Sequence, residues 1–391
     1  MFGVDRRLLI IALILFVNAL GSGLILPLLP FFAIAMDASP VAIGLLIATL
    51  PLFATLAGPP LGALSDRHGR KPLLLLSLAG TVLGFIILGT AASLPLIFLS
   101  RAIDGASAGN TSIARAAIAD ITSRESRVAG IGVAFAMESL GLIAGPLLGG
   151  IFAPYGLTVS AFVAVAIAVL CFVLVLVAFP ETRATEHQPS PPLGDMLGAV
   201  RSPRTRVLVI VIFAVQLLIM MMWGTLALYA NELFQFGGSE LGYVSAYAAS
   251  AGVLSQVGLL RLLTRLIPDK AILVAGLLAM AAGLALIALG KVPPVMLLGV
   301  GLMAASFNTA MPTAIGLVSR LASETEQGRV MGTTASAISL ASVFGPIVAG
   351  ALFSVSARGS YAAAAVVALA AAAIAVRGIS LRRPADPAGT S

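Results

Sequence analysis

The chain has 391 residues, of which 59% are hydrophobic and 10% are charged, and its formal net charge is +7. The apolar residues form repeated blocks of about 20, the length that an α-helix needs to cross a bilayer, which excludes a β-barrel with its strands of about 10 residues. The positive charge is spread over many short loops rather than gathered on one domain face, which excludes a nucleic-acid-binding domain.

The apolar blocks predict an all-α integral membrane protein with twelve spans. The first block is too long for the core of a cleavable signal peptide, so we expect it to remain as the first span. In chain order, the predicted spans cover 8–34, 41–64, 72–92, 95–119, 129–153, 158–179, 207–232, 239–263, 271–290, 294–318, 329–353 and 360–379.

The basic residues indicate how these spans are oriented. An even number of spans puts both termini on one side of the membrane. Of the 23 Lys and Arg residues, only Lys291 and Arg358 fall in loops on the other side, and Arg101 falls inside a span. Loops rich in Lys and Arg face the cytoplasm. We therefore predict a multi-pass protein of the cell's inner (plasma) membrane with both termini in the cytoplasm.

The loop between the second and third spans, GALSDRHGRKP at 62–72, is unusually rich in charge. Its glycines permit a tight turn, and its carboxylate can pair with arginines or with the partial charge of a helix end. Such pairs are worth about 1 kcal/mol each, enough to bias two conformations without locking either. We predict a latch at the cytoplasmic gate, and the alternative is a simple topology anchor. The latch residues are Gly62, Asp66, Arg67, Gly69, Arg70 and Lys71.

Arg101 and Asp104 lie in the interior of the predicted fourth span, and Arg115 lies near its cytoplasmic end. A charge within a membrane helix costs about 2.5 to 3.5 kcal/mol on insertion scales, and it usually serves a function. Arg101 and Asp104 are three positions apart, so they can pair on one face of a helix. We predict that this pair takes part in proton coupling, with Arg101 keeping Asp104 ionised. The alternative is a purely structural ion pair.

The fifth predicted span is marked by glycines and a proline. Removing side chains from one helix face lets a second helix approach, and proline bends the helix. We predict that this span closes the extracellular side tightly, and the alternative is ordinary packing. The residues concerned belong to the stretch GLIAGPLLGG at 141–150 and are Gly141, Gly145, Pro146, Gly149 and Gly150.

The same span contains one acid, Glu138, which has no charged partner within helical reach on its own helix. Such a carboxyl group is neutral in apolar surroundings and ionised when water reaches it. A coupling carboxylate needs this behaviour, so we predict that Glu138 carries the proton. The alternative is a structural, permanently protonated glutamate.

A polar, proline-rich stretch at 180–206 divides the spans six and six. It predicts a cytoplasmic linker between a bundle at 1–179 and a bundle at 207–391. The two halves also share residues at a constant spacing of 200, which indicates duplication and a site between two six-helix bundles. The coinciding pairs are Gly132/Gly332, Ser139/Ser339, Leu140/Leu340, Gly145/Gly345, Pro146/Pro346 and Gly150/Gly350.

Polar residues from four spans are predicted at a similar depth. At about 1.5 Å per residue, each lies roughly 14 to 16 Å into its span, near the midplane. They are Asn18, Asp104, Glu138 and Gln216. Soft apolar side chains are expected to line the rest of a substrate cavity, because methionine and aromatic surfaces accommodate varied shapes; the alternative for any one of them is helix packing. Together with Asn18 and Gln216, the predicted substrate-binding residues are Met220, Trp223, Tyr243, Tyr247 and Asn308.

Several of these stretches resemble the major facilitator superfamily. The 62–72 loop matches its pattern G-x-x-x-D-R-x-G-R-[RK], and 141–150 matches the G-x-x-x-G-P-x-x-G-G signature of its antiporters. Arg101 stands where its drug:proton antiporters have an arginine in span 4. NALGSGLILPLLP at 18–30 and IADIT at 118–122 are similar to the tetracycline-efflux-like subgroup. The resemblance implies that family's fold, twelve helices in two six-helix bundles.

Two departures from the subgroup bear on the site. Asn18 stands where the subgroup has an aspartate in span 1, and the region around Met280 lacks the acid expected in span 9. Conversely, Asp104 and Glu138 are acids where the subgroup is apolar or small. The proton carrier is therefore expected at Glu138 first and at Asp104 second, and binding of a magnesium-tetracycline chelate is not implied.

These observations together predict a proton-coupled antiporter that exports small amphipathic drugs or metabolites by alternating access. The alternatives are a proton-linked uptake symporter or facilitator, and a non-transporting membrane receptor or scaffold. The pattern G-x-x-x-x-G-K-[ST] and any catalytic constellation are absent, so we expect neither ATP hydrolysis nor an enzyme. One cysteine and two histidines offer no metal-site spacing. We expect no metal, no cofactor and no nucleic acid, and a monomer in contact with membrane lipid.

Overall fold

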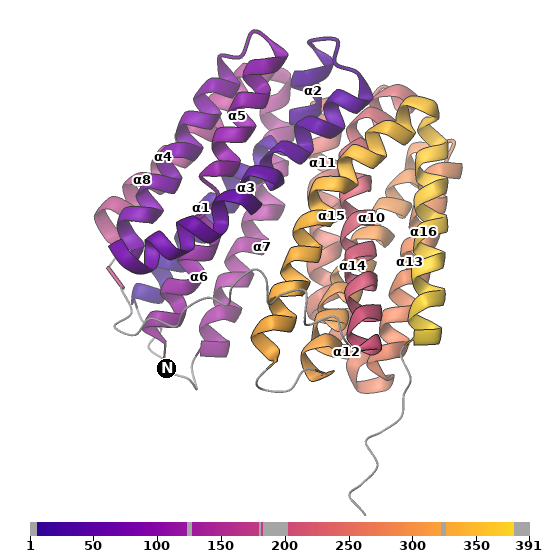
Figure 1. Ribbon diagram of the computed structural model, residues 1–391. Coiled ribbons are helices and arrows are strands. Elements are labelled where there is room, and N and C mark those ends of the chain that lie inside the picture. The colour runs from indigo at the N-terminus through magenta and orange to yellow at the C-terminus, as the bar shows by residue number, and fades with distance from the viewer. Residues whose placement is uncertain (1–5, 123–126, 180, 183–201, 322–325, 379–391) are drawn as a thin grey trace, which may run out of the picture. The chain divides into compact units, whose positions relative to one another are not determined.

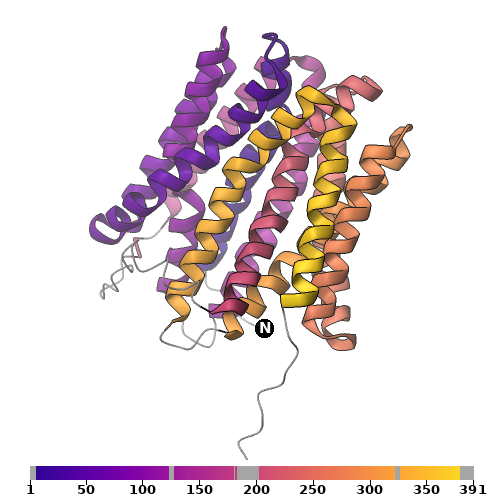
Figure 2. The ribbon, with the colours of Figure 1, turned by 45° about the vertical axis from the view of Figure 1, so that its right-hand side comes forward.

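The computed structural model describes residues 6–122, 127–179, 181–182, 202–321 and 326–378. Within these ranges the secondary structure is helical and contains no β-strand. Figures 1 and 2 show elongated helices joined by short connections at their ends. The prediction of an all-α fold is therefore confirmed for the described part of the chain.

The helices before the predicted linker correspond closely to the predicted spans. They are α1 (Arg6–Ile25), α2 (Leu29–Ile34), α3 (Pro40–His68), α4 (Arg70–Gly89), α5 (Leu94–Ala106), α6 (Asn110–Ile121), α7 (Arg127–Phe152) and α8 (Leu157–Ala178), with a 3-10 turn at Ala153–Tyr155.

The helices after it begin with α10 (Pro203–Phe234) and α11 (Gly238–Leu254). A π-helical turn at Ser255–Leu259 then leads into α12 (Leu260–Leu266). The remaining helices are α13 (Asp269–Leu289), α14 (Pro293–Leu321), α15 (Gln327–Val355) and α16 (Ala357–Gly378).

Eleven of the described helical segments are long and apolar enough to cross a membrane. The twelfth predicted span, 95–119, is broken into α5 and α6, of 13 and 12 residues, and their combined length fits one crossing. The predicted span is therefore present, with a break at Ser107–Gly109 that the sequence analysis did not predict. The α-helical pattern ends where Ser107 N donates to both Ile103 O and Asp104 O, and Gly109 N donates to Ser107 O at 2.7 Å.

Glycines in the neighbouring helix α4 make room for this break. A Cβ atom at Gly80 would meet the Ser107 hydroxyl at 1.8 Å, and one at Gly84 would meet Ser100 O at 3.0 Å. Ser107 therefore occupies the place of a side chain that Gly80 lacks. Larger residues at 80 and 84 would push α5 away from α4.

The described residues divide into two compact units. The first comprises Met1–Pro189, Met221–Ser250 and Ser342–Ala357, and the second comprises Ser190–Met220, Ala251–Ala341 and Arg358–Ser391. Helices α10, α11 and α15 contribute to both units. The six-and-six division at 180–206 remains a prediction, and most of that stretch lies outside the described residues.

Helix boundaries repeat at the spacing that the sequence suggested. Helix α8 begins at Leu157 and ends at Ala178, and α16 begins at Ala357 and ends at Gly378. Helix α4 begins at Arg70, and α13 begins at Asp269, one residue short of that spacing. Large apolar side chains such as Leu56 of α3 and Val177 of α8 are exposed, as expected where lipid rather than water is the solvent.

Candidate functional site

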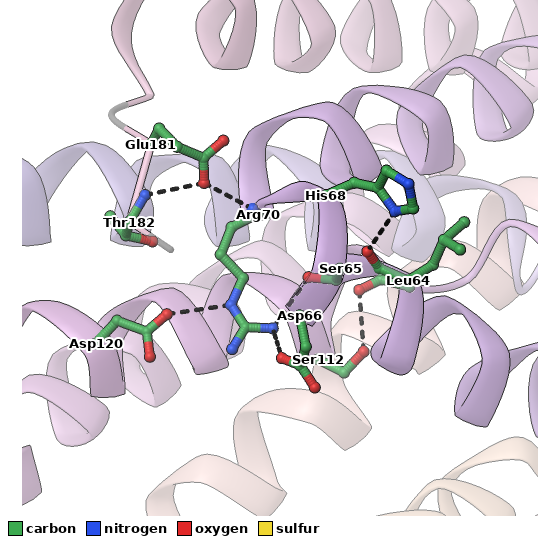
Figure 3. Close-up of polar contacts among 10 residues, drawn as sticks. Leu64, Ser65, Asp66, His68, Arg70, Ser112, Asp120, Glu181 and Thr182 are labelled. Atoms are coloured by element: carbon green, nitrogen blue, oxygen red, sulfur yellow. Dashed lines mark hydrogen bonds and ion pairs between the residues drawn. The ribbon is translucent and has the colours of Figure 1, made fainter. Parts of the chain in front are cut away.

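Arg70 is the centre of a polar cluster in the first unit, at the start of α4 (Figure 3). Its Nη1 atom lies 2.5 Å from the Asp66 carboxylate, and its Nε donates to Asp120 at 3.1 Å. Nη1 also donates to the Ser65 hydroxyl at 3.0 Å. Arg70 therefore ties the end of α3 to the end of α6. The arginine is 11% exposed and Asp120 is 14% exposed, so water screens this pair only partly.

A second carboxylate, Glu181, binds the backbone at the same point. Glu181 follows α8, and its Oε1 accepts from Arg70 N at 2.7 Å (Figure 3). Its Oε2 accepts from Lys71 N at 3.3 Å. The first amides of a helix have no partner within the helix, and the helix dipole favours an anion beside them. Glu181 therefore connects the end of α8 to the start of α4.

Gly69, between α3 and α4, is required by both conformation and space. Its φ of +100° lies in the region that side-chain-bearing residues rarely adopt. A Cβ atom at this position would also meet the Glu181 carboxylate, 2.6 Å from Oε2. By contrast, a Cβ at Gly62 would meet nothing within 4 Å. Among the two glycines of this loop, Gly69 is therefore the one whose missing side chain the surrounding contacts require.

The predicted latch residues therefore differ in their surroundings. Asp66 and Arg70 form an ion pair, and Lys71 contributes its amide to Glu181. Arg67 lies in the last turn of α3 and forms no ion pair with the described residues. Sequence reasoning missed Asp120 and Glu181, although each is an acid next to the end of a predicted span.

Replacing Arg70 by Ala is expected to slow transport about tenfold while the protein remains in the membrane. The latch prediction holds that the ion pairs of Arg70 favour one conformation over another, and partly exposed pairs add only about 1 kcal/mol each to stability. Transport rate and membrane content are measured together, with Asp66→Asn as a second variant. His68→Ala is the control, because His68 is exposed in the same loop. Full activity of Arg70→Ala and Asp66→Asn would leave this loop as a topology anchor.

Asn18, Arg101 and Asp104 come together in a buried polar network of the first unit. Arg101 Nη1 donates to Asp104 Oδ2 at 3.1 Å, and both side chains are almost fully buried. The Thr81 side chain hydrogen-bonds to Asp104. Asn110 Nδ2 donates to Asn18 Oδ1 at 3.1 Å and lies 3.4 Å from the Thr81 hydroxyl oxygen. The network links α1, α4, α5 and α6 around the helix break.

Thr81 and Asn110 were not predicted from the sequence. Both are polar residues within predicted spans, which is the signal that could have identified them. The Arg101 guanidinium also lies 5.4 Å from the centre of the Phe85 ring, a cation–π contact that stabilises its buried charge. Protonation of Asp104 would leave this buried arginine without its counter-ion, which is costly.

Glu138 has an arginine partner, so the expectation of an unpaired carboxyl group is wrong. Arg115 Nη2 from α6 lies 2.5 Å from Glu138 Oε2 in α7. The Arg115 guanidinium also lies 4.5 Å from the centre of the Phe135 ring. The sequence argument considered only partners on the same helix, and Arg115 reaches Glu138 from a neighbouring one. The side chains are 40% and 20% exposed, so this pair is more accessible than Arg101 and Asp104.

The glycines of the fifth predicted span pack against the backbone of α1. Cβ atoms at Gly141, Gly145 and Gly149 would approach the carbonyl oxygens of Phe16, Leu20 and Leu24 to 2.5, 2.6 and 2.6 Å. Glycines spaced four residues apart in α7 thus contact residues spaced four apart in α1. Helix α1 therefore approaches this face of α7 closely, whereas closure of the extracellular side by this span remains a prediction.

The other two residues of that motif, Pro146 and Gly150, also lie in close contacts within the first unit. A Cβ at Gly150 would meet Ser239 O at 2.8 Å, and Pro146 Cδ lies 3.1 Å from the Cβ position of Gly23. Pro146 lies inside α7, which continues through it.

The predicted substrate-binding residues are distributed over both units. Asn18, Trp223, Tyr243 and Tyr247 belong to the first unit, and the tyrosines are 49% and 44% exposed. In the second unit, Gln216 is buried, and Asn308 Nδ2 donates to Ala304 O of its own helix at 3.0 Å. Met220 also lies in the second unit and is partly buried.

Asn308 is also close to α11. A Cβ atom at Gly252 would lie 2.4 Å from the Asn308 amide nitrogen, so Gly252 makes room for this side chain. No group of three or more His, Cys, Asp or Glu side chains suited to a metal ion occurs among the described residues.

Comparisons with known proteins bear on the family of this chain. The family model described as Major Facilitator Superfamily matches residues 11–286 and 208–391. The chain is 28% identical to the class C tetracycline resistance protein of Escherichia coli, over 90% of this chain and 91% of that protein. It is 27% identical to multidrug resistance protein 2 of Bacillus subtilis (strain 168), over 87% and 86% of the two chains.

Solved structures show the same fold. The human organic anion transporter MFSD10 (TETRAN) matches with a TM-score of 0.68 and 24% identity, over 96% of this chain and all of that one. An inward-facing bacterial homologue of the human lysosomal transporter Spinster matches with a TM-score of 0.78 and 18% identity, over 95% and 97% of the two chains.

Proposed function

Because this chain belongs to the major facilitator superfamily, we propose that it is a proton-coupled antiporter that exports small amphipathic compounds by alternating access. Its similarity to tetracycline and multidrug resistance proteins over most of both chains supports drug efflux. The observation that carries the coupling is the ion pair of Glu138 with Arg115, two charges within the membrane-spanning helices α6 and α7.

Glu138 is proposed to carry the proton, with Arg115 as its alternating partner. When Glu138 takes up a proton, the pair opens and Arg115 keeps its contact with the Phe135 ring and with water. When the proton leaves, the carboxylate again attracts Arg115. Because protonation changes the pairing of two charges, it can favour one of two conformations of the transporter.

The substrate is proposed to contact Asn18, Gln216 and the soft apolar residues Met220, Trp223, Tyr243, Tyr247 and Asn308. The methionine and aromatic side chains adapt to apolar groups of varied shape, and the amide side chains can hydrogen-bond to polar groups of an amphipathic compound. We further propose that the protein works as a monomer in the cell's inner membrane with both termini in the cytoplasm, as the distribution of Lys and Arg indicates.

The direction of proton-linked drug flux distinguishes an exporter from an uptake symporter. Inverted membrane vesicles acidified inside are expected to accumulate a fluorescent amphipathic drug, and a protonophore is expected to stop it. Loss of accumulation together with drug entry into right-side-out vesicles would identify an uptake symporter. An absence of flux in both orientations would identify a receptor or scaffold. A panel of unrelated drugs, tetracycline included, tested for growth inhibition in a strain without its own pumps then defines the substrates.

A further inference from the structure

The two ion pairs inside the first unit lie on opposite sides of the break between α5 and α6. Arg101 and Asp104 both belong to α5. The other pair, here called the carrier pair, joins Arg115 of α6 to Glu138 of α7. Turns at Ser107–Gly109 replace the regular helix between α5 and α6. The position of α6 is therefore not fixed by a continuous helix, and other contacts must hold the arginine of the carrier pair in place.

Two buried side chains connect the helices across this break. Thr81 of α4 hydrogen-bonds to Asp104 of α5. The Thr81 hydroxyl oxygen also accepts, at 3.4 Å, from Nδ2 of Asn110, the first residue of α6. Thr81 is 4% exposed and Asn110 is 7% exposed, so water does not compete for these bonds. Since Asp104 is itself paired with Arg101, the start of α6 is attached to a buried ion pair of α5.

Asn110 also attaches α6 to α1. Its Nδ2 atom donates to Asn18 Oδ1 at 3.1 Å. Asn18 lies between Phe16 and Leu20, the two residues whose carbonyl oxygens the first two motif glycines of α7 approach most closely. The same short stretch of α1 therefore contacts α7, which supplies the glutamate of the carrier pair, and α6, which supplies its arginine.

The length of α6 makes the carrier pair sensitive to the position of Asn110. The helix has 12 residues, and Arg115 follows Asn110 by five positions. At about 1.5 Å per residue, this separation is roughly 7 Å along a rigid helix, so a displacement at Asn110 also moves Arg115. Arg115 Nη2 lies 2.5 Å from Glu138 Oε2. A shift of about 1 Å or more would break this contact, because hydrogen bonds weaken steeply beyond their normal length.

Packing alone does not account for an amide at position 110. The Oδ1 atom of Asn110 accepts no hydrogen bond from the described residues, whereas Nδ2 has two acceptors. A buried carbonyl oxygen without a donor is unfavourable. A leucine would fill a similar space without this cost, so the amide group is explained by the two hydrogen bonds that it donates.

From these contacts we infer that Thr81 and Asn110 are positioning residues of the transport cycle, which hold the start of α6 so that Arg115 meets Glu138. The hydrogen bonds described for both residues end at other groups, so they act on the carrier pair through α6. The inference rests on the proposed function, because the position of Arg115 affects coupled transport only if Glu138 carries the proton.

The test removes one hydroxyl group. Thr81→Val keeps the shape of the side chain and loses its hydrogen bonds, whereas Thr81→Ser keeps the hydroxyl. In proteoliposomes with a proton gradient, Thr81→Val is expected to lower the maximal rate of transport of a fluorescent amphipathic drug about fivefold, with the Kd for the drug unchanged. Thr81→Ser is expected to stay within about twofold of the wild-type rate. Asn110→Ala, which removes both donated bonds, is expected to lower the rate at least as much as Thr81→Val.

A double variant distinguishes positioning from a general structural defect. Arg115→Gln alone is expected to lower the maximal rate about fivefold, because Glu138 then has no cation to pair with when its proton leaves. If Thr81 acts through Arg115, adding Thr81→Val to Arg115→Gln lowers the rate no further. Two independent defects would instead multiply to a loss of about 25-fold.

Ser77→Ala is the matched control. Ser77 lies one turn before Thr81 in α4 and is also buried, and its hydroxyl has no hydrogen-bond partner among the described residues. Its replacement is expected to leave the transport rate unchanged. A wild-type rate in Thr81→Val, or multiplied losses in the double variant, would overturn the inference and leave the proposed function intact. A wild-type protein without proton-linked flux would instead contradict the proposed function.

Discussion

Proton-coupled drug accumulation is expected to fall to background in a Glu138→Gln variant, with drug binding preserved. Glutamine keeps the size of the side chain and cannot release a proton, and Arg115 loses its charged partner. The measurement is drug-evoked proton release from purified protein at several pH values, combined with drug binding by fluorescence. Of the substitutions considered, this one is expected to reduce coupled transport most, because it removes the exchangeable proton itself.

Two further variants distinguish Glu138 from other acids. Glu232→Gln makes the same chemical change at an exposed carboxyl group of α10 and is expected to leave proton release unchanged. Asp104→Asn is expected to weaken both binding and transport, because it leaves the buried Arg101 without its counter-ion. Normal proton release from Glu138→Gln would reject the assignment and move the carrier to Asp104.

Replacing Gly145 by Leu is expected to reduce export at least tenfold and to lower the melting temperature of the purified protein by several degrees. Even a Cβ atom there would lie 2.6 Å from Leu20 O and 2.9 Å from Gly23 Cα, so α1 and α7 must separate. Forcing extra atoms into packed helices typically costs about 1 to 3 kcal/mol. Gly145→Ala is expected to show the same effects at a smaller size.

The same helix provides a matched control for this prediction. Gly132 also lies in α7, and a Cβ atom there would meet nothing within 4 Å of the described residues. Gly132→Ala should therefore preserve both export and melting temperature. Equal behaviour of Gly145→Leu and Gly132→Ala would show that close approach of α1 and α7 is not needed for transport.

The sequence predicted contacts between residues that are close in the chain better than contacts between distant ones. Arg101 and Asp104 are three positions apart, and their predicted pairing is present. Glu138 and Arg115 are 23 positions apart and on different helices, and hydrophobic blocks contain no information about which helices become neighbours. Glu181 reaches Arg70 across 111 positions, which no local pattern indicates.

The break in the fourth predicted span had a similar cause. A continuous apolar block with small residues is compatible with an unbroken helix, and the sequence analysis placed one at 95–119. The break depends on a residue outside the block. Gly80 of α4 has no side chain, and Ser107 occupies the space that a side chain there would fill. Likewise, the sequence showed which spans contain the aromatic residues proposed to line a cavity. It did not show which of them are exposed, because exposure depends on the rotation of each helix about its axis. Trp223 is partly buried, whereas Tyr243 is half exposed.

The contact of Gly69 with Glu181 has a mechanical consequence. Glycine in a loop is commonly associated with freedom of movement, but here the missing side chain lets a carboxylate bind the first turn of α4. The end of α8 is therefore attached to the rest of the first unit at a second point, because Glu181, three residues after that helix, is hydrogen-bonded to the amides of Arg70 and Lys71. A side chain at position 69 would remove this attachment without touching α8 or α4 themselves.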